Sequence, residues 1–186
     1  IRNKSGYGFE DTIQRLKEIT QIYADDDRFK SDLESKSFYK DIASRDTRYL
    51  LYHYGQNLEI DIPEDTGSPL SNILEGDFQV EHILAKELEE AEIPEDIEDF
   101  EEQVHRLGNL TIANGYWNRE YGNLPFAQKK QADSQREVAY ATSDLRVQRV
   151  LADYPEFTKS ELEKREHEIT RYAMNEWALD YDVEHS

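Results

Sequence analysis

The sequence contains no cysteine, which excludes disulfide bonds and zinc sites built on thiolates. Any bound metal must therefore use histidine, carboxylate, amide oxygen or water, a set of ligands that favours hard divalent ions. The chain also lacks an apolar run long enough to cross a bilayer, and it shows no secretory signal pattern. We expect a soluble, cytoplasmic protein with no membrane partner.

Basic residues are scarce: 22 Lys and Arg stand against 41 Asp and Glu, for a net charge of −19. A DNA-binding protein is usually basic, because contacts with phosphates supply much of its affinity. The imbalance is uneven, since residues 81–103 hold eleven acids and one lysine, whereas residues 105–149 hold seven basic residues and four acids. Two origins of the acidity stay open: a halophilic source, or a partner domain that supplies the basic surface.

The length of 186 residues suits one domain with a helical extension. Apolar residues spaced by three and four predict a helix over residues 9–24, and shorter helices are predicted over 30–39 and 44–54. Proline and glycine mark a loop over residues 63–69. We predict a helical N-terminal region over residues 1–76 and a second region, with a different pattern, over residues 77–186.

Short β-like patterns in the second region predict strands over residues 77–84 and 107–113. Between the strands, Pro94 is placed to open an acidic helix whose inward side chains are Ile97, Phe100 and Val104. A stretch rich in Asn and Gly follows the second strand, and then a helix is predicted over 125–132. The fold class predicted from these elements is α+β and mostly helical.

Two further helices are predicted to close the chain. Ser134 is the expected cap of the first. Thr158 and Glu161 form a capping-box pattern before the second, whose apolar side includes Leu162, Ile169 and Trp177.

The residue types needed for phosphodiester hydrolysis are concentrated in two stretches, Val80-Glu81-His82-Ile83 and His105-Arg106-Leu107-Gly108-Asn109-Leu110-Thr111. The reaction needs an activated water, a cation on the developing charge and a held phosphate. His82 is the candidate general base, because the unperturbed pKa of histidine lies near neutrality. Asn109 is expected to hold the loop and orient His82.

The cation and the phosphate each have candidate partners. Glu81 and Asn118 offer a carboxylate and an amide oxygen to one cation. Neighbouring side chains on a strand point to opposite faces, so Glu81 and His82 can serve one site only where the strand ends or bulges. Lys129 and Lys130 follow on a helix and are candidates to meet phosphates.

Each of these pieces also has an ordinary structural interpretation. A Gly-Asn pair after a leucine is often only a turn, and an isolated asparagine is more often a loop residue than a ligand. Two adjacent lysines usually lie on a solvated face. His105 has two interpretations, since it can pack beside the site or belong to the acidic helix.

The combination is more specific than its pieces. Residues 81–130 resemble the HNH-type nuclease domain at the C-terminal end of GmrSD-like, modification-dependent restriction enzymes. The resemblance rests on Glu81-His82-Ile83, His105 to Thr111, the Asn-rich loop from Asn118 to Asn123, Pro125-Phe126 and Lys129-Lys130. The segment from Asn118 to Pro125 is similar to the HNH domain of RNA-guided CRISPR nucleases as well.

The resemblance implies a ββα-metal core, in which two short strands and a helix surround one Mg²⁺ or Mn²⁺. By position, His82 would be the general base, Glu81 and Asn118 the metal ligands, and Asn109 the residue that supports the loop. Asn114 stays a rival to Asn118, because the loop after the second strand varies in length in such families. The family usually has Pro-Gln where this chain has Ala85-Lys86.

The same resemblance implies DNA as substrate and an upstream NTPase or sensor domain, or a partner subunit, that senses modified DNA. Arg119, Lys129 and Lys130 would contact the nucleic acid. His105, Asn123 and Arg165 are possible supporting residues.

The leading hypothesis is a metal-dependent HNH endonuclease acting on DNA, as the cleaving part of a restriction or antiviral defence system. Two other hypotheses stay open. One is a non-catalytic module with the same fold that binds nucleic acid or protein, which the acidity supports. The other is a purely helical interaction protein in which the motifs are accidental.

Overall fold

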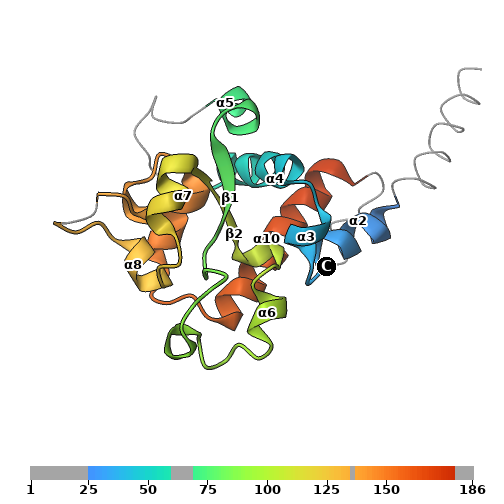
Figure 1. Ribbon diagram of the computed structural model, residues 1–186. Helices are drawn as coiled ribbons and strands as arrows, with labels where there is room; N and C mark the ends of the chain where they lie inside the picture. The colour runs from blue at the N-terminus through green and yellow to red at the C-terminus, as the bar shows by residue number, and fades with distance from the viewer. Residues whose placement is uncertain (1–24, 60–68, 135–136, 179–186) are drawn as a thin grey trace, which may run out of the picture.

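A computed structural model describes residues 25–59, 69–134 and 137–178 of the chain. It has a mixed α+β fold that is mostly helical, as the sequence predicts (Figure 1). The helices are α2 (Asp26–Leu33), α3 (Phe38–Asp41), α4 (Ser44–Gln56), α5 (Leu70–Glu75), α6 (Phe100–Gln103), α7 (Gly115–Tyr121), α8 (Phe126–Lys130), α9 (Arg146–Arg149) and α10 (Lys159–Trp177). Short 3₁₀ turns are η1 (Glu90–Glu92), η2 (Leu107–Asn109), η3 (Tyr140–Thr142) and η4 (Val150–Asp153).

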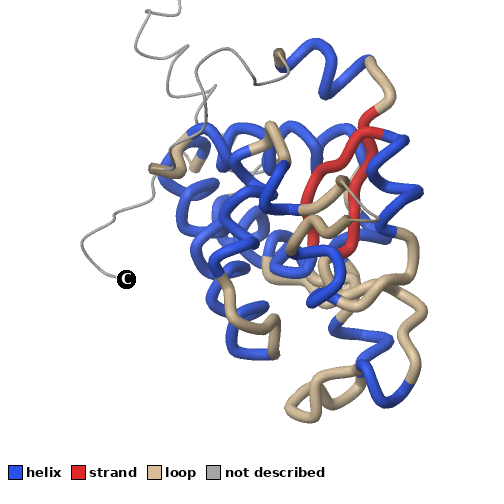
Figure 2. Tube along the Cα trace, turned by 90° about the vertical axis from the view of Figure 1, so that its left-hand side faces the viewer, coloured by secondary structure: helices blue, strands red, loops and turns tan. Residues whose placement is uncertain are grey.

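Two antiparallel strands, β1 (Phe78–His82) and β2 (Leu110–Asn114), form the small sheet at the centre of the fold. They run side by side, with Val80 opposite Ile112 (Figure 2). α7 and α8 lie to one side of the pair, and α4 and α10 lie to the other (Figure 1). Both predicted strands are confirmed, although the second begins three residues later than expected because η2 occupies its start.

The predicted helix over residues 30–39 is wrong in its extent, because α2 ends at Leu33 and α3 begins at Phe38. The two serines between them bond locally: the Ser37 backbone N–H donates to the Ser35 hydroxyl over 3.2 Å. Such side-chain bonds to nearby backbone compete with the helical pattern and favour a break. The predicted helix over residues 44–54 is confirmed by α4, and the one over 9–24 lies outside the described residues.

The acidic segment after Pro94 forms less helix than predicted. Asp99 has a positive φ of 52°, a left-handed conformation that interrupts a right-handed helix, and α6 is only four residues long. Ile97 and Val104 are nevertheless buried, at 7% and 2% exposure, as the pattern predicts. The apolar side chains are therefore placed by packing rather than by a continuous helix.

The stretch rich in Asn and Gly forms helix α7, which the sequence did not lead us to expect. Asn114 caps it, since its side chain accepts a 2.9 Å hydrogen bond from the Trp117 backbone N–H. Gly122 ends it with a φ of 45°, a conformation that glycine adopts readily. The helix predicted near residues 125–132 is confirmed by α8.

Of the two helices predicted near the end of the chain, the structure has only the second among its described residues. No helix begins at Ser134, and the described residues from 137 form only the short elements η3, α9 and η4 before α10. The second prediction is confirmed, because α10 begins with the Thr158–Glu161 capping box and buries Leu162 and Ile169.

α10 packs closely against η2. A Cβ on Gly108 would lie 2.1 Å from the carbonyl oxygen of Leu162, so only glycine permits this approach. Arg106 forms an ion pair with the buried Glu166, with 3.1 Å between Nε and Oε1. Part of the motif from His105 to Thr111 therefore anchors the last helix. Side chains from both predicted regions, residues 1–76 and 77–186, pack together in one apolar cluster.

No helix among the described residues is long and apolar enough to cross a membrane.

Candidate active site

A polar pocket of about 440 Å³ lies along the edge of β1 that does not pair with β2. Backbone and side chains from β1, from the loop after it, from α3 and α4, and from α7 and the turn that follows form its walls. The lining residues are Tyr39, Ser44, Gln79, Val80, Glu81, His82, Ala85, Lys86, Asn118, Gly122 and Asn123. Glu81, His82, Asn118 and Asn123 of the predicted site thus share one pocket.

Two adjacent residues at the end of β1 border the same pocket. Glu81 and His82 are the last two residues of the strand, and both line the pocket. Both are also largely buried, at 5% exposure each. The four consecutive residues 79–82 all line the pocket, which runs along the edge of the strand, so it borders residues of both strand faces.

His82 is held by aromatic contacts rather than by hydrogen bonds. Its ring meets Tyr39 edge-on with 4.4 Å between centroids, and it lies 5.7 Å from the ring of His105. Its Nε2 is buried without a hydrogen-bond partner among the described residues. Burial, with Lys86 and other nearby positive groups, lowers the pKa of His82 to about 3, so the ring is neutral at physiological pH.

His105 is ambiguous from the sequence, and the structure places it outside α6. It stacks on Tyr39 with 5.7 Å between ring centroids, and its carbonyl accepts a hydrogen bond from the Tyr39 backbone N–H over 3.0 Å. His105 thus packs beside the site, against the rings of both Tyr39 and His82.

Glu81 forms a buried ion pair. Lys129 Nζ lies 2.6 Å from Glu81 Oε1 and also donates a 2.7 Å hydrogen bond to the carbonyl oxygen of His82. The Lys129 side chain is 0% exposed. Burial raises the pKa of Glu81 and lowers the pKa of Lys129, and the attraction between the two groups opposes both shifts.

The prediction that Lys129 contacts a phosphate is wrong, whereas the same prediction for the half-buried Lys130 stays untested. Lys129 has no exposed atoms with which to reach a nucleic acid, because its ammonium is enclosed with Glu81. Lys130 Nζ donates to the carbonyl oxygen of Tyr154. Arg119, in contrast, is exposed on α7. The helix buries the one lysine because its apolar face, with Phe126, turns toward the core.

Asn118 and Asn114 have different roles. Asn118 Nδ2 donates a 2.8 Å hydrogen bond to Gln79 Oε1, and this leaves its Oδ1 buried without a partner among the described residues. Asn114 does not line the pocket, and its Oδ1 is already occupied in capping α7. Of the two, only Asn118 has an amide oxygen available at the pocket.

Asn109 does not reach the pocket. It is completely buried and holds the loop that follows His82, since its Oδ1 accepts from the Leu84 backbone N–H over 2.8 Å. Its Nδ2 donates to the carbonyl oxygens of Leu84 and Val104 over 3.0 and 2.9 Å. Asn109 therefore holds the loop after His82, and none of its described side-chain hydrogen bonds goes to a residue that lines the pocket.

Two possible supporting residues lie at opposite extremes of exposure. Asn123 is exposed at the pocket and donates a 3.0 Å hydrogen bond to Glu87. Arg165 lies on α10 away from the pocket, is 1% exposed, and its Nη1 contacts the carbonyl oxygen of Gly108 at 3.4 Å. Arg165 therefore acts on the packing of η2 rather than at the pocket.

Four lining residues with polar side chains were not singled out from the sequence as site residues: Tyr39, Ser44, Gln79 and Lys86. Lys86 is exposed at the pocket, and its Nζ lies 5.8 Å from the centre of the Tyr39 ring. The signal for Lys86 was its place at the departure from the usual Pro-Gln. Gln79 was detectable by its spacing, two residues from Glu81 and on the same face of the strand. Tyr39 and Ser44 are distant in sequence and carry no such signal.

The pocket offers a small set of oxygen donors. No three His, Asp or Glu side chains gather into a metal-binding cluster anywhere in the described part of the chain. The candidate oxygen donors are the Glu81 carboxylate, which Lys129 also contacts, and the unpartnered Oδ1 of Asn118, and both residues line one polar pocket. This set fits a hard divalent ion that keeps several water ligands, as Mg²⁺ usually does.

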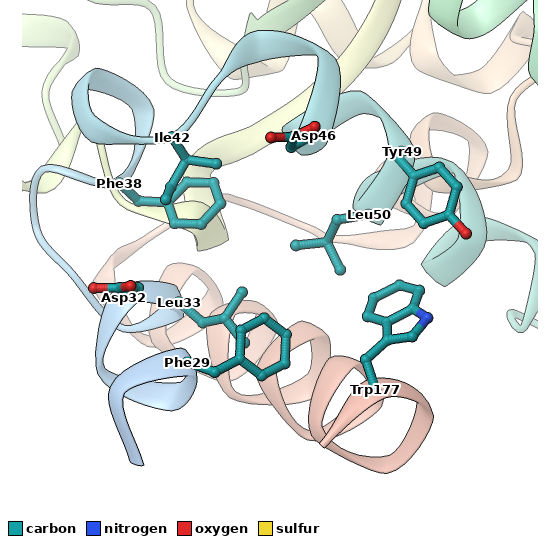
Figure 3. A pocket seen from close by; sticks show the side chains of 9 residues that line it. All are labelled: Phe29, Asp32, Leu33, Phe38, Ile42, Asp46, Tyr49, Leu50 and Trp177. Carbon is teal, nitrogen blue, oxygen red and sulfur yellow. The ribbon is translucent and has the colours of Figure 1, made fainter. Parts of the chain in front are cut away.

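A second cavity, of about 410 Å³, lies between α2, α4 and the end of α10, and its character is different (Figure 3). Its lining residues are Phe29, Asp32, Leu33, Phe38, Ile42, Asp46, Tyr49, Leu50 and Trp177. Asp32 and Asp46 are its only charged groups. With no histidine, amide or basic group, it offers nothing to activate water or hold a phosphate, so the polar pocket is the better candidate site.

Comparison with known proteins gives one match. The family described as GmrSD restriction endonucleases, C-terminal domain, matches residues 23–172. This segment includes every residue that lines the polar pocket. No curated protein and no solved structure matches the chain.

Proposed function

Because this chain belongs to the family of GmrSD restriction endonuclease C-terminal domains, we propose that it is a metal-dependent DNA endonuclease of the HNH type. Membership of the family makes it a nuclease domain related to restriction enzymes. The finer assignment rests on one observation: Glu81, His82 and Asn118 line a single polar pocket at the end of β1.

The order of elements around the pocket supports the HNH assignment. β1 and β2 are antiparallel, and α7 follows β2 directly. Glu81 and His82 end the first strand, and Asn118 lies in the middle of the helix. This is the set of elements expected of a ββα-metal core, with the general base and one ligand on the strand and the second ligand on the helix.

His82 is the proposed general base. A base must be unprotonated before it can accept a proton, and burial keeps His82 in its neutral form; the same burial makes the ring a weaker base than a free imidazole, so the role rests on the place of His82 at the pocket. Its unpartnered Nε2 is the atom that would take a proton from the attacking water. The Tyr39 ring fixes the plane of the imidazole, and Asn109 fixes the backbone that follows it. A positioned base of this kind typically contributes about 10²–10⁴-fold to the rate.

Glu81 and Asn118 are the proposed ligands of Mg²⁺ or Mn²⁺, through the carboxylate and Oδ1. When bound, such an ion stabilises the negative charge that develops on the phosphate during cleavage. Gln79 orients Asn118 by accepting from its Nδ2, so that Oδ1 remains available to the pocket.

Lys86 and Arg119 are the proposed contacts to DNA, because both are exposed and Lys86 lines the pocket. Two surface cations supply little of the affinity that a basic protein obtains from phosphates. The charge of −19 therefore favours a partner that provides the main DNA-binding surface, such as an upstream NTPase or sensor domain or another subunit.

Plasmid cleavage tests the proposal. Wild type, His82→Ala and the control His167→Ala, an exposed position on α10, would be compared with Mg²⁺ or Mn²⁺ at low and at molar salt. We expect cleavage that requires the metal and falls at least about 10²-fold in His82→Ala only. Wild-type rates in His82→Ala would remove His82 from the mechanism. A folded wild type that binds DNA without cutting it under any of these conditions would favour the non-catalytic module.

A further inference from the structure

Lys129 stands out because its charge is completely enclosed. It lies near the end of α8, and its ammonium contacts the two residues at the end of β1: Glu81 Oε1 at 2.6 Å and the His82 carbonyl at 2.7 Å. The ring of Tyr121 has its centre 6.0 Å from Nζ. A group 48 residues away in the sequence is thus joined to both candidate site residues at once.

Stability alone is a poor explanation for such a pair. Removing two charges from water costs free energy that their attraction often does not recover, and apolar side chains of similar volume commonly pack as stably. A buried lysine paired with a carboxylate is more readily explained by a role at that carboxylate. Here the carboxylate is the proposed ligand of a divalent ion, and it lines the pocket.

The ammonium and a divalent ion would compete for the same negative charge. An ion held by Glu81 would lie within a few ångströms of the Lys129 ammonium, where burial leaves the repulsion between like charges poorly screened. A DNA phosphate entering the pocket adds negative charge that offsets this repulsion. Metal binding and DNA binding should therefore reinforce each other at this site.

We propose that Lys129 is a positioning residue and the resident counter-ion of Glu81, and that it keeps the affinity of the pocket for divalent ions low until a DNA phosphate enters. This inference rests on the proposed function, because it takes Glu81 as a metal ligand. Beyond that function, it says when the Glu81 carboxylate becomes available to a metal ion.

The test is Mn²⁺ binding to the full 186-residue chain without DNA, measured by the electron paramagnetic resonance signal of the free ion. Lys129→Met keeps the aliphatic stem and removes the charge. Lys130→Met is the matched control, because Lys130 is adjacent and bonds instead to the carbonyl of Tyr154. We expect Lys129→Met to bind Mn²⁺ at least tenfold more tightly than wild type, and Lys130→Met to bind it equally.

Binding that is unchanged or weaker in Lys129→Met overturns the inference, since a merely structural lysine would not restrain metal affinity. If Lys129→Met does not fold, Lys129→Gln is used under the same criterion, because its amide can still donate to the His82 carbonyl without carrying a charge.

A second measurement adds a short DNA duplex. The gain in Mn²⁺ affinity on adding DNA should be large in wild type and at least tenfold smaller in Lys129→Met. Glu81→Gln separates the two proposals. If it stops cleavage while Lys129→Met binds Mn²⁺ as wild type does, the counter-ion role fails and the proposed function stands. If Glu81→Gln cleaves like wild type, both fail.

Discussion

Replacing Asn109 with alanine should destabilise the protein strongly. The change removes three buried hydrogen bonds, which join Asn109 to the backbone of Leu84 twice and to the carbonyl of Val104 once. A net loss of about 1 kcal/mol per bond, with a further cost for the buried groups left unpaired, gives about 3–5 kcal/mol. Native domains are stable by only about 5–15 kcal/mol, so the loss is a large part of the total.

Urea unfolding followed by circular dichroism measures the effect. With a slope of about 2 kcal/mol per molar urea, the midpoint should fall by roughly 1.5–2.5 M. Asn123→Ala is the control, because its single hydrogen bond to Glu87 is exposed, and its midpoint should stay close to that of wild type. A midpoint for Asn109→Ala that matches wild type would refute the interpretation of Asn109 as the residue that holds the loop after His82.

Three other variants test separate features. Burial lowers the pKa of His82 from 6.5 to about 3, so the unfolded chain binds the proton first and stability is lost as the pH falls from 6.5 toward 3. The free energy of unfolding would be measured in urea at pH 6 and pH 4. Wild type should lose up to about 1.4 kcal/mol more of it per pH unit than His82→Gln does, and an equal loss in the two proteins would contradict this. Lys86→Met should weaken DNA binding and lower the salt dependence of log K by about one, with stability within about 0.5 kcal/mol of wild type; an unchanged salt slope removes Lys86 from the interface. Gly108→Ala should cost about 1–3 kcal/mol in thermal unfolding, because its Cβ meets the Leu162 carbonyl oxygen at 2.1 Å, and an unchanged Tm would argue against this close contact.

Local patterns were sufficient to predict much of the fold. Alternation located both strands, and helical spacing with a capping box located α4 and α10. The break between α2 and α3 depends on hydrogen bonds of Ser35 and Ser37, which compete with a helix that the apolar spacing favours. Asp99 interrupts the acidic helix through a backbone conformation that its residue type permits but does not require.

The missed helix α7 shows a signal that was present but outweighed. Asn114 is a good helix cap, yet the density of Asn and Gly after β2 favoured a loop. The cap also favours Asn118 over Asn114 as the ligand, since Asn114 Oδ1 accepts a hydrogen bond in capping and Asn118 Oδ1 has no partner among the described residues.

The motif identified the residues of the pocket better than it identified their environments. The two motif stretches and the family resemblance grouped Glu81, His82 and Asn118 as one site, and the three residues share one pocket. The burial of Lys129 depends on how α8 docks against β1, which is a tertiary contact that no local pattern encodes. Tyr39 was missed for the same reason, because it reaches His82 from a distant part of the chain.

The most direct test of a single metal-dependent site is the concentration of Mg²⁺ that gives half-maximal DNA cleavage. It would be measured for wild type, Glu81→Gln, Asn118→Ala and the control Gln128→Ala, an exposed position on α8. We predict that this concentration rises at least tenfold in Glu81→Gln and in Asn118→Ala and stays unchanged in the control. Cleavage that persists without any divalent ion, or the same Mg²⁺ requirement in all four proteins, would contradict the proposed site.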